Sequence, residues 1–212
     1  CQQLEGHPNA IKISDVVEHH GRVVLIQEFV AGRSLLELVF GSMRESEKER
    51  TILQLVDVVA HAHKNRIVHR DIKPENVLIG SDGLLKLLDY GVAKELKDKK
   101  FSSTMVGSRP YMAPEQIMGE SQIASDVWAL GVVIYMLYTH VLPFVEANEK
   151  ALMDLILTRE PDPPRHINPD IPSELEKIIL QCLKKDPIER FADAGVLKER
   201  ILDTFPRFGK HS

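Results

Sequence analysis

Cysteine is scarce in this sequence, where only Cys1 and Cys182 occur among 212 residues. Two cysteines so far apart exclude a disulfide-rich scaffold and a zinc site built from paired cysteines, and they fit a reducing compartment. We therefore expect a cytoplasmic protein. The sequence begins with Cys rather than Met, and no basic stretch followed by an apolar run opens it, so we expect a fragment without a signal peptide.

Positive charge is not in excess either. Lys and Arg number 27 against 31 Asp and Glu, which leaves a formal net charge of -4. Without an overall basic field the chain is not expected to bind nucleic acid or an anionic membrane, and any phosphate binding has to be local. The 43% hydrophobic and 27% charged residues are those of an ordinary globular chain with a buried core, so a disordered chain is excluded.

One long run lacks charge altogether. Residues 127–145 contain no Asp, Glu, Lys or Arg over roughly the length that a bilayer requires. Gly131, Thr139, His140 and Pro143 interrupt the run, and no cluster of Lys or Arg flanks it. Because a helix that is apolar on all sides also occurs at the centre of larger globular proteins, we favour a buried core helix, with a membrane span as the alternative.

The first part of the chain predicts β structure. Residues 11–16 and 22–29 are rich in strand formers and flank a turn-like His-His-Gly at residues 19–21, which predicts a hairpin. After residue 30 the pattern becomes helical. We therefore expect a small β piece, a hinge and a larger helical piece, which together make an α+β fold.

The helical part begins with a capped turn. Residues 31–34 interrupt the β pattern, and Ser34 is a suitable N-cap for a short helix that runs to Val39. Further helices are predicted at residues 47–64, 124–138, 149–157, 173–184 and 192–204, with a Pro-rich connector at residues 161–172.

A second hairpin carries polar residues at its base. Residues 77–79 and 84–88 are apolar runs around an Asp-Gly pair at residues 82–83, which suits a two-residue type I′ turn. In that register Asn76 and Asp89 lie opposite each other on one face. An amide oxygen and a carboxylate in this arrangement predict a Mg²⁺ site.

Two more functional groups stand just upstream. Asp71 and Lys73 lie in a segment that cannot continue as helix, because Pro74 follows it. The loop can therefore bring a further carboxylate and an ammonium group to the predicted metal.

Three motifs of this region resemble those of one family. His69-Arg70-Asp71, followed by Lys73 and Asn76, resembles the catalytic loop of the eukaryotic-type (Hanks-type) serine/threonine protein kinases. Asp89-Tyr90-Gly91 resembles the metal-binding tripeptide of that family, with Tyr in place of the usual Phe. Ala113-Pro114-Glu115 resembles the end of its activation segment.

The resemblance extends over nearly the whole chain. Residues 28–30 look like the hinge, residues 125–128 open the uncharged helix, and Arg190 lies where the family pairs an Arg with the Glu of Ala-Pro-Glu. This implies an α+β, protein-kinase-like fold, with a mainly α-helical C-terminal lobe and the last strands of the β-rich N-terminal lobe. The implied domains are 1–30 (the end of the N-terminal lobe, with a helix end and two strands, and the hinge), 31–205 (the C-terminal lobe) and 206–212 (a tail).

The resemblance also implies what the motif residues do. Asp71 would accept or orient the proton of a substrate hydroxyl, and Lys73 would neutralise the γ-phosphoryl oxygens. Asn76 and Asp89 would hold Mg²⁺. The position of Lys73, together with Gly107-Ser108, is typical of serine/threonine rather than tyrosine kinases.

An ATP site and a regulatory site are implied as well. Backbone groups of Glu28 and Val30 would contact adenine, with Gln27 at the back of the pocket and Ser34 near the ribose. The full set implied to bind nucleotide is Gln27, Glu28, Val30, Ser34, Lys73, Glu75, Asn76 and Asp89. Thr104 is the expected phosphosite, and the implied regulatory set is Arg70, Lys94, Thr104 and Ser108.

The sequence therefore predicts a serine/threonine protein kinase that transfers the γ-phosphoryl group of ATP to a protein hydroxyl with the help of Mg²⁺. A catalytically silent kinase-like binding module is the alternative, because the G-x-G-x-x-G loop and the V-A-I-K lysine are absent from these residues. Four residues are expected to have structural roles: His69 beneath the loop, Asp126 supporting the loop backbone, and Glu115 with Arg190 as an ion pair.

Overall fold

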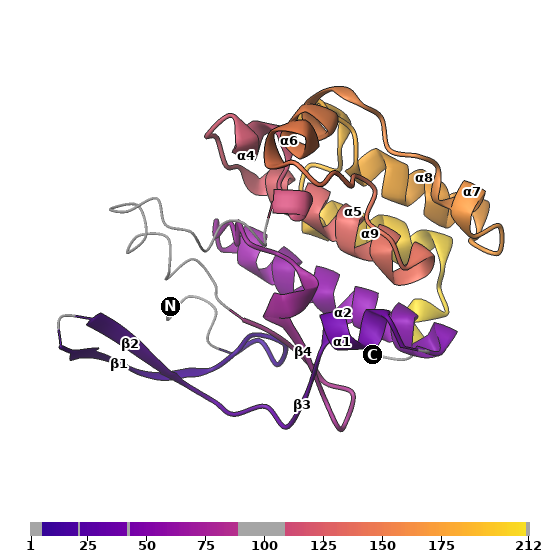
Figure 1. Ribbon diagram of the computed structural model, residues 1–212. Coiled ribbons are helices and arrows are strands. Elements are labelled where there is room, and N and C mark those ends of the chain that lie inside the picture. Colours follow the sequence, from indigo (N-terminus) through magenta and orange to yellow (C-terminus); the bar gives the residue numbers. More distant parts are fainter. Residues whose placement is uncertain (1–5, 21, 42, 89–108, 211–212) are drawn as a thin grey trace.

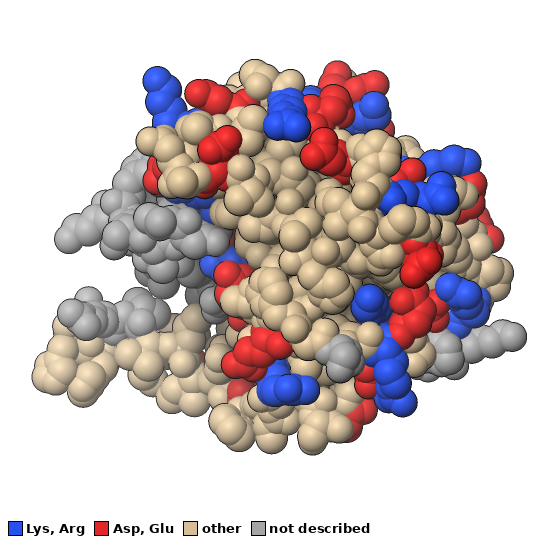
Figure 2. Space-filling view, turned by 45° about the vertical axis from the view of Figure 1, so that its right-hand side comes forward, with Lys and Arg blue, Asp and Glu red and all other residues tan. Residues whose placement is uncertain are grey.

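The computed structural model describes residues 6–20, 22–41, 43–88 and 109–210. A body of packed helices makes up most of it, and two small antiparallel sheets lie at one edge (Figure 1). Figure 2 shows acidic and basic side chains interspersed over the face drawn there, which fits the near balance of charge in the sequence.

The first sheet is a hairpin of β1 (Ile13–His19) and β2 (Arg22–Gln27), which extends to one side of the helices (Figure 1). His19 pairs with Arg22, so two residues connect the strands. His20 has a φ of 50°, the left-handed conformation that such a tight turn requires. The predicted hairpin is confirmed, although β1 begins and ends later in the chain than the sequence pattern indicates.

The second sheet has three strands in the order β3-β4-β5. The predicted interruption at residues 31–34 is wrong in part, because three of these residues pair with β4 and tertiary pairing outweighs the weak local preference. Gly32 allows the close approach, since a Cβ there would lie 2.1 Å from the carbonyl oxygen of Ile79. The strands are β3 (Gly32–Ser34), β4 (Val77–Gly80) and β5 (Leu85–Leu87).

The turn between β4 and β5 differs from the predicted two-residue turn. Val77 pairs with Leu87, which leaves residues 81–83 as a three-residue loop. The N–H of Gly83 donates to the carbonyl of Gly80 at 2.9 Å, and Gly83 has a φ of 78°. A tight turn followed by a left-handed glycine is the usual form of a three-residue hairpin loop, so Asp-Gly does not form the type I′ turn here.

This difference of one residue matters at the base of the hairpin. The N–H of Leu88 donates to the carbonyl of Asn76 at 2.8 Å, so Asn76 lies opposite Leu88. The prediction that the ladder places Asn76 opposite Asp89 is therefore wrong, because a shift of one residue exchanges the two faces of a strand. Asp89 itself lies outside the described residues.

Helices form at every predicted place. Ser34 caps α1 (Leu35–Val39): its Oγ accepts the N–H of Glu37, and the Glu37 carboxylate accepts the N–H of Ser34. The last predicted helix begins at residue 194 rather than 192, because Asp193 takes the N-cap position. The remaining helices are α2 (Glu45–Lys64), α4 (Pro114–Ile117), α5 (Ile123–Thr139), α6 (Glu149–Thr158), α7 (Pro164–Ile167), α8 (Ser173–Cys182) and α9 (Ala194–Thr204). Short 3₁₀ turns are η2 (Pro74–Asn76), η4 (Arg109–Tyr111), η5 (Pro187–Glu189) and η6 (Phe208–Lys210).

Helix α5 is the central helix of the body. All of its residues from 124 to 139 are buried, which confirms the prediction of a core helix. Gly131 lets α8 approach closely, since a Cβ there would lie 2.5 Å from the Cβ of Cys182. Within the described part of the chain, no helix has both the length and the apolar character needed to cross a bilayer.

The segment beyond α9 returns to α2. Arg207 forms an ion pair with Glu49 at 2.7 Å, and the rings of Phe205 and Phe208 stack with centroids 5.3 Å apart. Phe208 is only 1% exposed. Phe208, which lies in the tail (residues 206–212) that the resemblance implies, therefore contributes to the hydrophobic core.

We predict that Phe208→Ala lowers the free energy of unfolding by about 3–5 kcal/mol, because it removes a fully buried ring and leaves a cavity. Urea unfolding followed by circular dichroism measures the change. Phe40→Ala is the matched control, since Phe40 is 66% exposed, and it should change the free energy of unfolding by less than about 0.5 kcal/mol. Equal effects of the two substitutions would contradict the packed position of Phe208.

Candidate active site

The polar motif residues lie on an irregular loop, residues 65–73, between α2 and η2. Lys73 is extended, with a φ of -161°, as the residue before Pro74 has to be. Arg66 and Arg70 have positive φ values of 60° and 72°, which side chains with a Cβ rarely adopt. Such a backbone persists only where surrounding contacts hold it.

Asp126 supplies the main support of this loop. It lies in the first turn of α5 and is 1% exposed. Its Oδ2 accepts the N–H of His69 at 2.7 Å, and its Oδ1 accepts the N–H of Arg70 at 2.8 Å. The ring of His69 is buried beneath the loop, where its Nε2 bonds to the carbonyl of Leu88 at 2.8 Å. The structural roles predicted for Asp126 and His69 are confirmed.

The same carboxylate also holds α2. Asp126 Oδ2 lies 3.0 Å from Nε2 of His63. The N–H of Ala194 donates to Nδ1 of His63 at 3.0 Å, so Nε2 carries the ring hydrogen and donates it to Asp126. One buried carboxylate thus connects the loop, α2, α5 and, through His63, the start of α9.

Asp71, Lys73 and Asn76 come together at the end of the loop. Asn76 Nδ2 donates to the backbone carbonyl of Asp71 at 2.8 Å and to its Oδ2 at 3.1 Å. Lys73 Nζ lies 3.3 Å from the same Oδ2. Lys73 and Asn76 thus hold the Asp71 carboxylate in place. Because the Asp71 side chain is 36% exposed, the carboxylate also remains accessible from solvent. Because Asn76 turns its amide nitrogen to Asp71, its Oδ1 is the atom left for a metal ion.

Glu75 lies next to this group, close to Tyr111. Its Oε2 is buried and has no hydrogen-bond partner among the described residues. Burial and the nearby charge of Glu75 both raise the pKa of Tyr111, which therefore stays protonated as it donates to the sulfur of Met136 at 3.6 Å.

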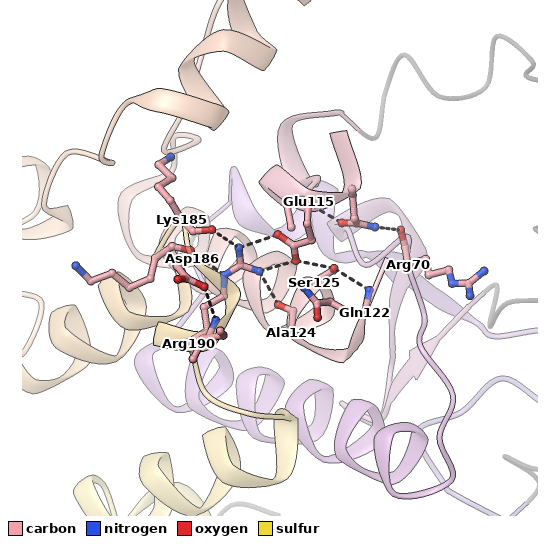
Figure 3. A network of polar contacts seen from close by, with 12 residues as sticks. Arg70, Glu115, Gln122, Ala124, Ser125, Lys185, Asp186 and Arg190 are labelled. Atoms are coloured by element: carbon pink, nitrogen blue, oxygen red, sulfur yellow. Dashed lines mark hydrogen bonds and ion pairs between the residues drawn. The ribbon is translucent and has the colours of Figure 1, made fainter. Parts of the chain in front are cut away.

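A buried ion pair fixes α4 next to the loop (Figure 3). Arg190 Nη1 and Nη2 donate to the two carboxylate oxygens of Glu115 at 2.8 and 2.9 Å, and Ser125 Oγ donates to Glu115 at 2.7 Å. Although burial opposes ionisation, the hydrogen bonds from Arg190 and Ser125 hold the pKa of Glu115 below its usual value. The predicted pair of Glu115 and Arg190 is confirmed.

A model of the protein kinase domain matches residues 1–202 of this chain. The chain belongs to the protein kinase domain family. In the structure the His69-Arg70-Asp71 motif, the Ala-Pro-Glu segment and helix α5, which are characteristic of this family, contact one another.

Several protein kinases are similar to this kinase domain. Serine/threonine-protein kinase PrkC of Bacillus subtilis is 35% identical over 204 residues, which cover 94% of this chain and 32% of that protein. Serine/threonine-protein kinase Pkn1 of Myxococcus xanthus is 34% identical over 93% of this chain and 30% of its own length. The human SNF-related serine/threonine-protein kinase is 31% identical over 90% of this chain and 25% of its own length. The chain thus spans a third or less of these relatives.

Three of the residues that the resemblance implies to contact nucleotide, Gln27, Glu28 and Ser34, lie between the end of β2 and the start of α1. Two hydrogen bonds fix the Glu28 carboxylate. Its Oε1 accepts one from the N–H of Lys12 at 2.8 Å and one from Nζ of Lys86 at 2.7 Å. Partial burial opposes ionisation of Glu28, but these hydrogen bonds hold its pKa below the usual value. Gln27 ends β2, and the Oγ of Ser34 accepts the helix-capping hydrogen bond described above.

Four residues predicted to act at the site lie outside the described residues. These are Asp89, Lys94, Thr104 and Ser108. Arg70, which belongs to the predicted regulatory set, lies on the loop and has an exposed side chain.

Two residues that support this site were not predicted from the sequence, His63 and Gln116. His63, which no sequence motif singled out, bridges Asp126 to the start of α9. Gln116 follows Ala-Pro-Glu and reaches the loop, where its Nε2 donates to the carbonyl of Arg70 at 3.2 Å. Only the adjacency of Gln116 to a recognised motif hinted at a role, because the two partners are far apart in the chain.

We predict that Arg190→Met lowers the free energy of unfolding at pH 7 by about 3–5 kcal/mol, because it leaves the buried Glu115 carboxylate without a counter-ion. Since the pKa of Glu115 is depressed in the folded state, its ionised form stabilises the fold above the unfolded pKa, near 4.5, and this contribution is lost as the pH falls below it. The difference between wild type and Arg190→Met should therefore shrink from pH 6 to pH 3. Urea titrations across this range measure it, and a constant difference would contradict the assignment.

Proposed function

We propose that the protein containing this chain is a serine/threonine protein kinase that transfers the γ-phosphoryl group of ATP to a hydroxyl of a protein substrate. The observation that carries the proposal is the convergence of Asp71, Lys73 and Asn76, with contacts of 3.1 and 3.3 Å to one carboxylate oxygen. The names of the relatives support the same class of acceptor.

Asp71 is assigned to the acceptor hydroxyl. Its Oδ2 is engaged by Lys73 and Asn76, while more than a third of the side chain is open to solvent. A carboxylate held in this way orients a serine or threonine hydroxyl and takes up its proton as the phosphoryl group is transferred.

Lys73 is assigned to the transferred phosphoryl group. It is largely buried and lies beside Asp71, so its charge acts in an environment where water screens it weakly. An ammonium group in this position stabilises the negative charge that spreads over the phosphoryl oxygens.

Asn76 fits the Mg²⁺ that the kinase family typically uses. Its amide is buried, and its orientation toward Asp71 presents an oxygen, the atom that Mg²⁺ prefers as a ligand. We assign Asn76 and Asp89 as the residues that would hold the ion. When bound, Mg²⁺ neutralises charge on the phosphate oxygens of ATP.

The hinge residues are assigned to the rest of the nucleotide. The N–H of Glu28 already donates to the carbonyl of Lys12 at 2.9 Å, so we assign adenine contact to the carbonyl of Glu28 and to the backbone of Val30. Gln27 would line the back of the pocket, Ser34 would lie near the ribose, and Glu75 would complete the site. Residues 1–30 would then belong to the N-terminal lobe and hinge and residues 31–205 to the C-terminal lobe.

Regulation and location remain part of the proposal. Phosphorylation of Thr104 would place negative charge near Arg70, whose side chain is exposed, and near Lys94, with Ser108 between Thr104 and the Ala-Pro-Glu segment. Use of ATP and the scarcity of cysteine both fit a cytoplasmic site of action.

We predict that Asp71→Asn lowers the rate of phosphoryl transfer by about 10²-fold or more while the affinity for Mg·ATP changes little, because Asp71 acts on the acceptor and not on the nucleotide. Transfer of labelled γ-phosphate to casein and titration of a fluorescent ATP analogue, both with the full-length protein, measure the two quantities. Asp170→Asn is the control, since Asp170 is exposed and distant in sequence. A kinase-like module without catalysis would show no transfer in the wild type, and equal loss of rate and affinity would contradict the role of Asp71.

A further inference from the structure

Arg70, the residue before Asp71, has a strained backbone that is held from both sides. Its φ of 72° lies in the left-handed region, where residues with a Cβ are rarely stable. Its N–H donates to Asp126 at 2.8 Å, and its carbonyl accepts Nε2 of Gln116 at 3.2 Å. The peptide group that joins Arg70 to Asp71 is therefore fixed at its oxygen by a side chain from another element.

Gln116 is suited to this contact because both ends of its amide are used. It lies on α4 and is 8% exposed. Its Oε1 accepts the N–H of Ala113 at 3.0 Å, while its Nε2 reaches Arg70. An amide supplies an acceptor and a donor side by side, which neither a carboxylate nor an apolar side chain of similar size does.

The contact of Gln116 is separate from the neighbouring ion pair. The carboxylate of Glu115 turns toward Arg190 and Ser125, on the α5 side of α4 (Figure 3). Gln116, the next residue, turns toward the loop. Helix α4 thus has one side chain that anchors it to the body and one that reaches the backbone beside Asp71.

We propose that Gln116 is a positioning residue that fixes the peptide plane between Arg70 and Asp71 and so sets the orientation of the Asp71 carboxylate. The inference rests on the proposed kinase function, in which Asp71 handles the acceptor hydroxyl. It also couples the Ala-Pro-Glu segment to the loop, because the same amide is bound to Ala113.

The test uses the full-length protein with Gln116→Glu, Gln116→Leu and the control Gln122→Glu, which makes the same change at an exposed glutamine nearby. At pH 8 the carboxylate of Gln116→Glu faces the carbonyl of Arg70 and repels it. A protonated carboxyl group can donate to that carbonyl as the amide does, and burial favours the protonated form. Activity should therefore return as the pH falls.

The expected result is a kcat for casein phosphorylation about tenfold below wild type at pH 8 in both Gln116 variants, with the KM for ATP changed less than about twofold. Relative to wild type at the same pH, Gln116→Glu should recover to within about threefold at pH 6, whereas Gln116→Leu should not. Gln122→Glu should match wild type throughout. Wild-type kcat in Gln116→Leu, or a loss in Gln116→Glu that is the same at both pH values, would overturn the proposal.

Hydrogen–deuterium exchange gives a second readout that needs no activity. Peptides that cover residues 68–72 should exchange faster in Gln116→Leu than in wild type or Gln122→Glu, because the peptide group before Asp71 loses its partner. If the wild-type protein phosphorylates nothing, the proposed function fails while this measurement still decides the role of Gln116. Unchanged exchange in Gln116→Leu would overturn it.

Discussion

The arrangement of the whole site depends on one buried carboxylate, that of Asp126. It accepts hydrogen bonds from the backbone of His69 and Arg70 and from the ring of His63, at 2.7 to 3.0 Å. A buried carboxylate is stable only when its lone pairs are satisfied, and here the partners come from the loop and from α2. If the loop moved away, the buried Asp126 carboxylate would lose its hydrogen-bond partners. The free-energy cost of that state holds the loop against α5.

From this anchor the loop geometry follows step by step. The left-handed Arg70 turns the chain so that Asp71 emerges next to η2, where Asn76 and Lys73 meet its carboxylate. The hydrogen bond from Gln116 fixes the peptide group between Arg70 and Asp71 at its carbonyl oxygen. In the proposed kinase reaction, positive charge and amide groups would therefore be in position before a substrate binds, so that developing charge is stabilised without reorganisation of the site.

The sequence predicted what local patterns determine. The buried helix α5 and the N-cap of α1 at Ser34 depend on nearby residues, and both were found where predicted. The register of the second hairpin was not, because an Asp-Gly pair fits both a two-residue turn and the three-residue loop in which Gly83 takes a positive φ. The contact of Gln116 with Arg70 joins residues 46 positions apart, and no periodicity in the chain encodes such a pairing. The catalytic-loop motif could be recognised by its resemblance to a known family, whereas the contacts that support the loop could be predicted only in part.

The most direct test of this account is hydrogen exchange at the amides of His69 and Arg70, followed by NMR in wild type, Asp126→Asn and the exposed control Asp203→Asn. An asparagine amide at position 126 keeps one acceptor oxygen and cannot satisfy all three donors. We expect exchange at least about tenfold faster at both amides in Asp126→Asn, with Asp203→Asn like wild type. Wild-type protection of His69 and Arg70 in Asp126→Asn would contradict the central role of this carboxylate.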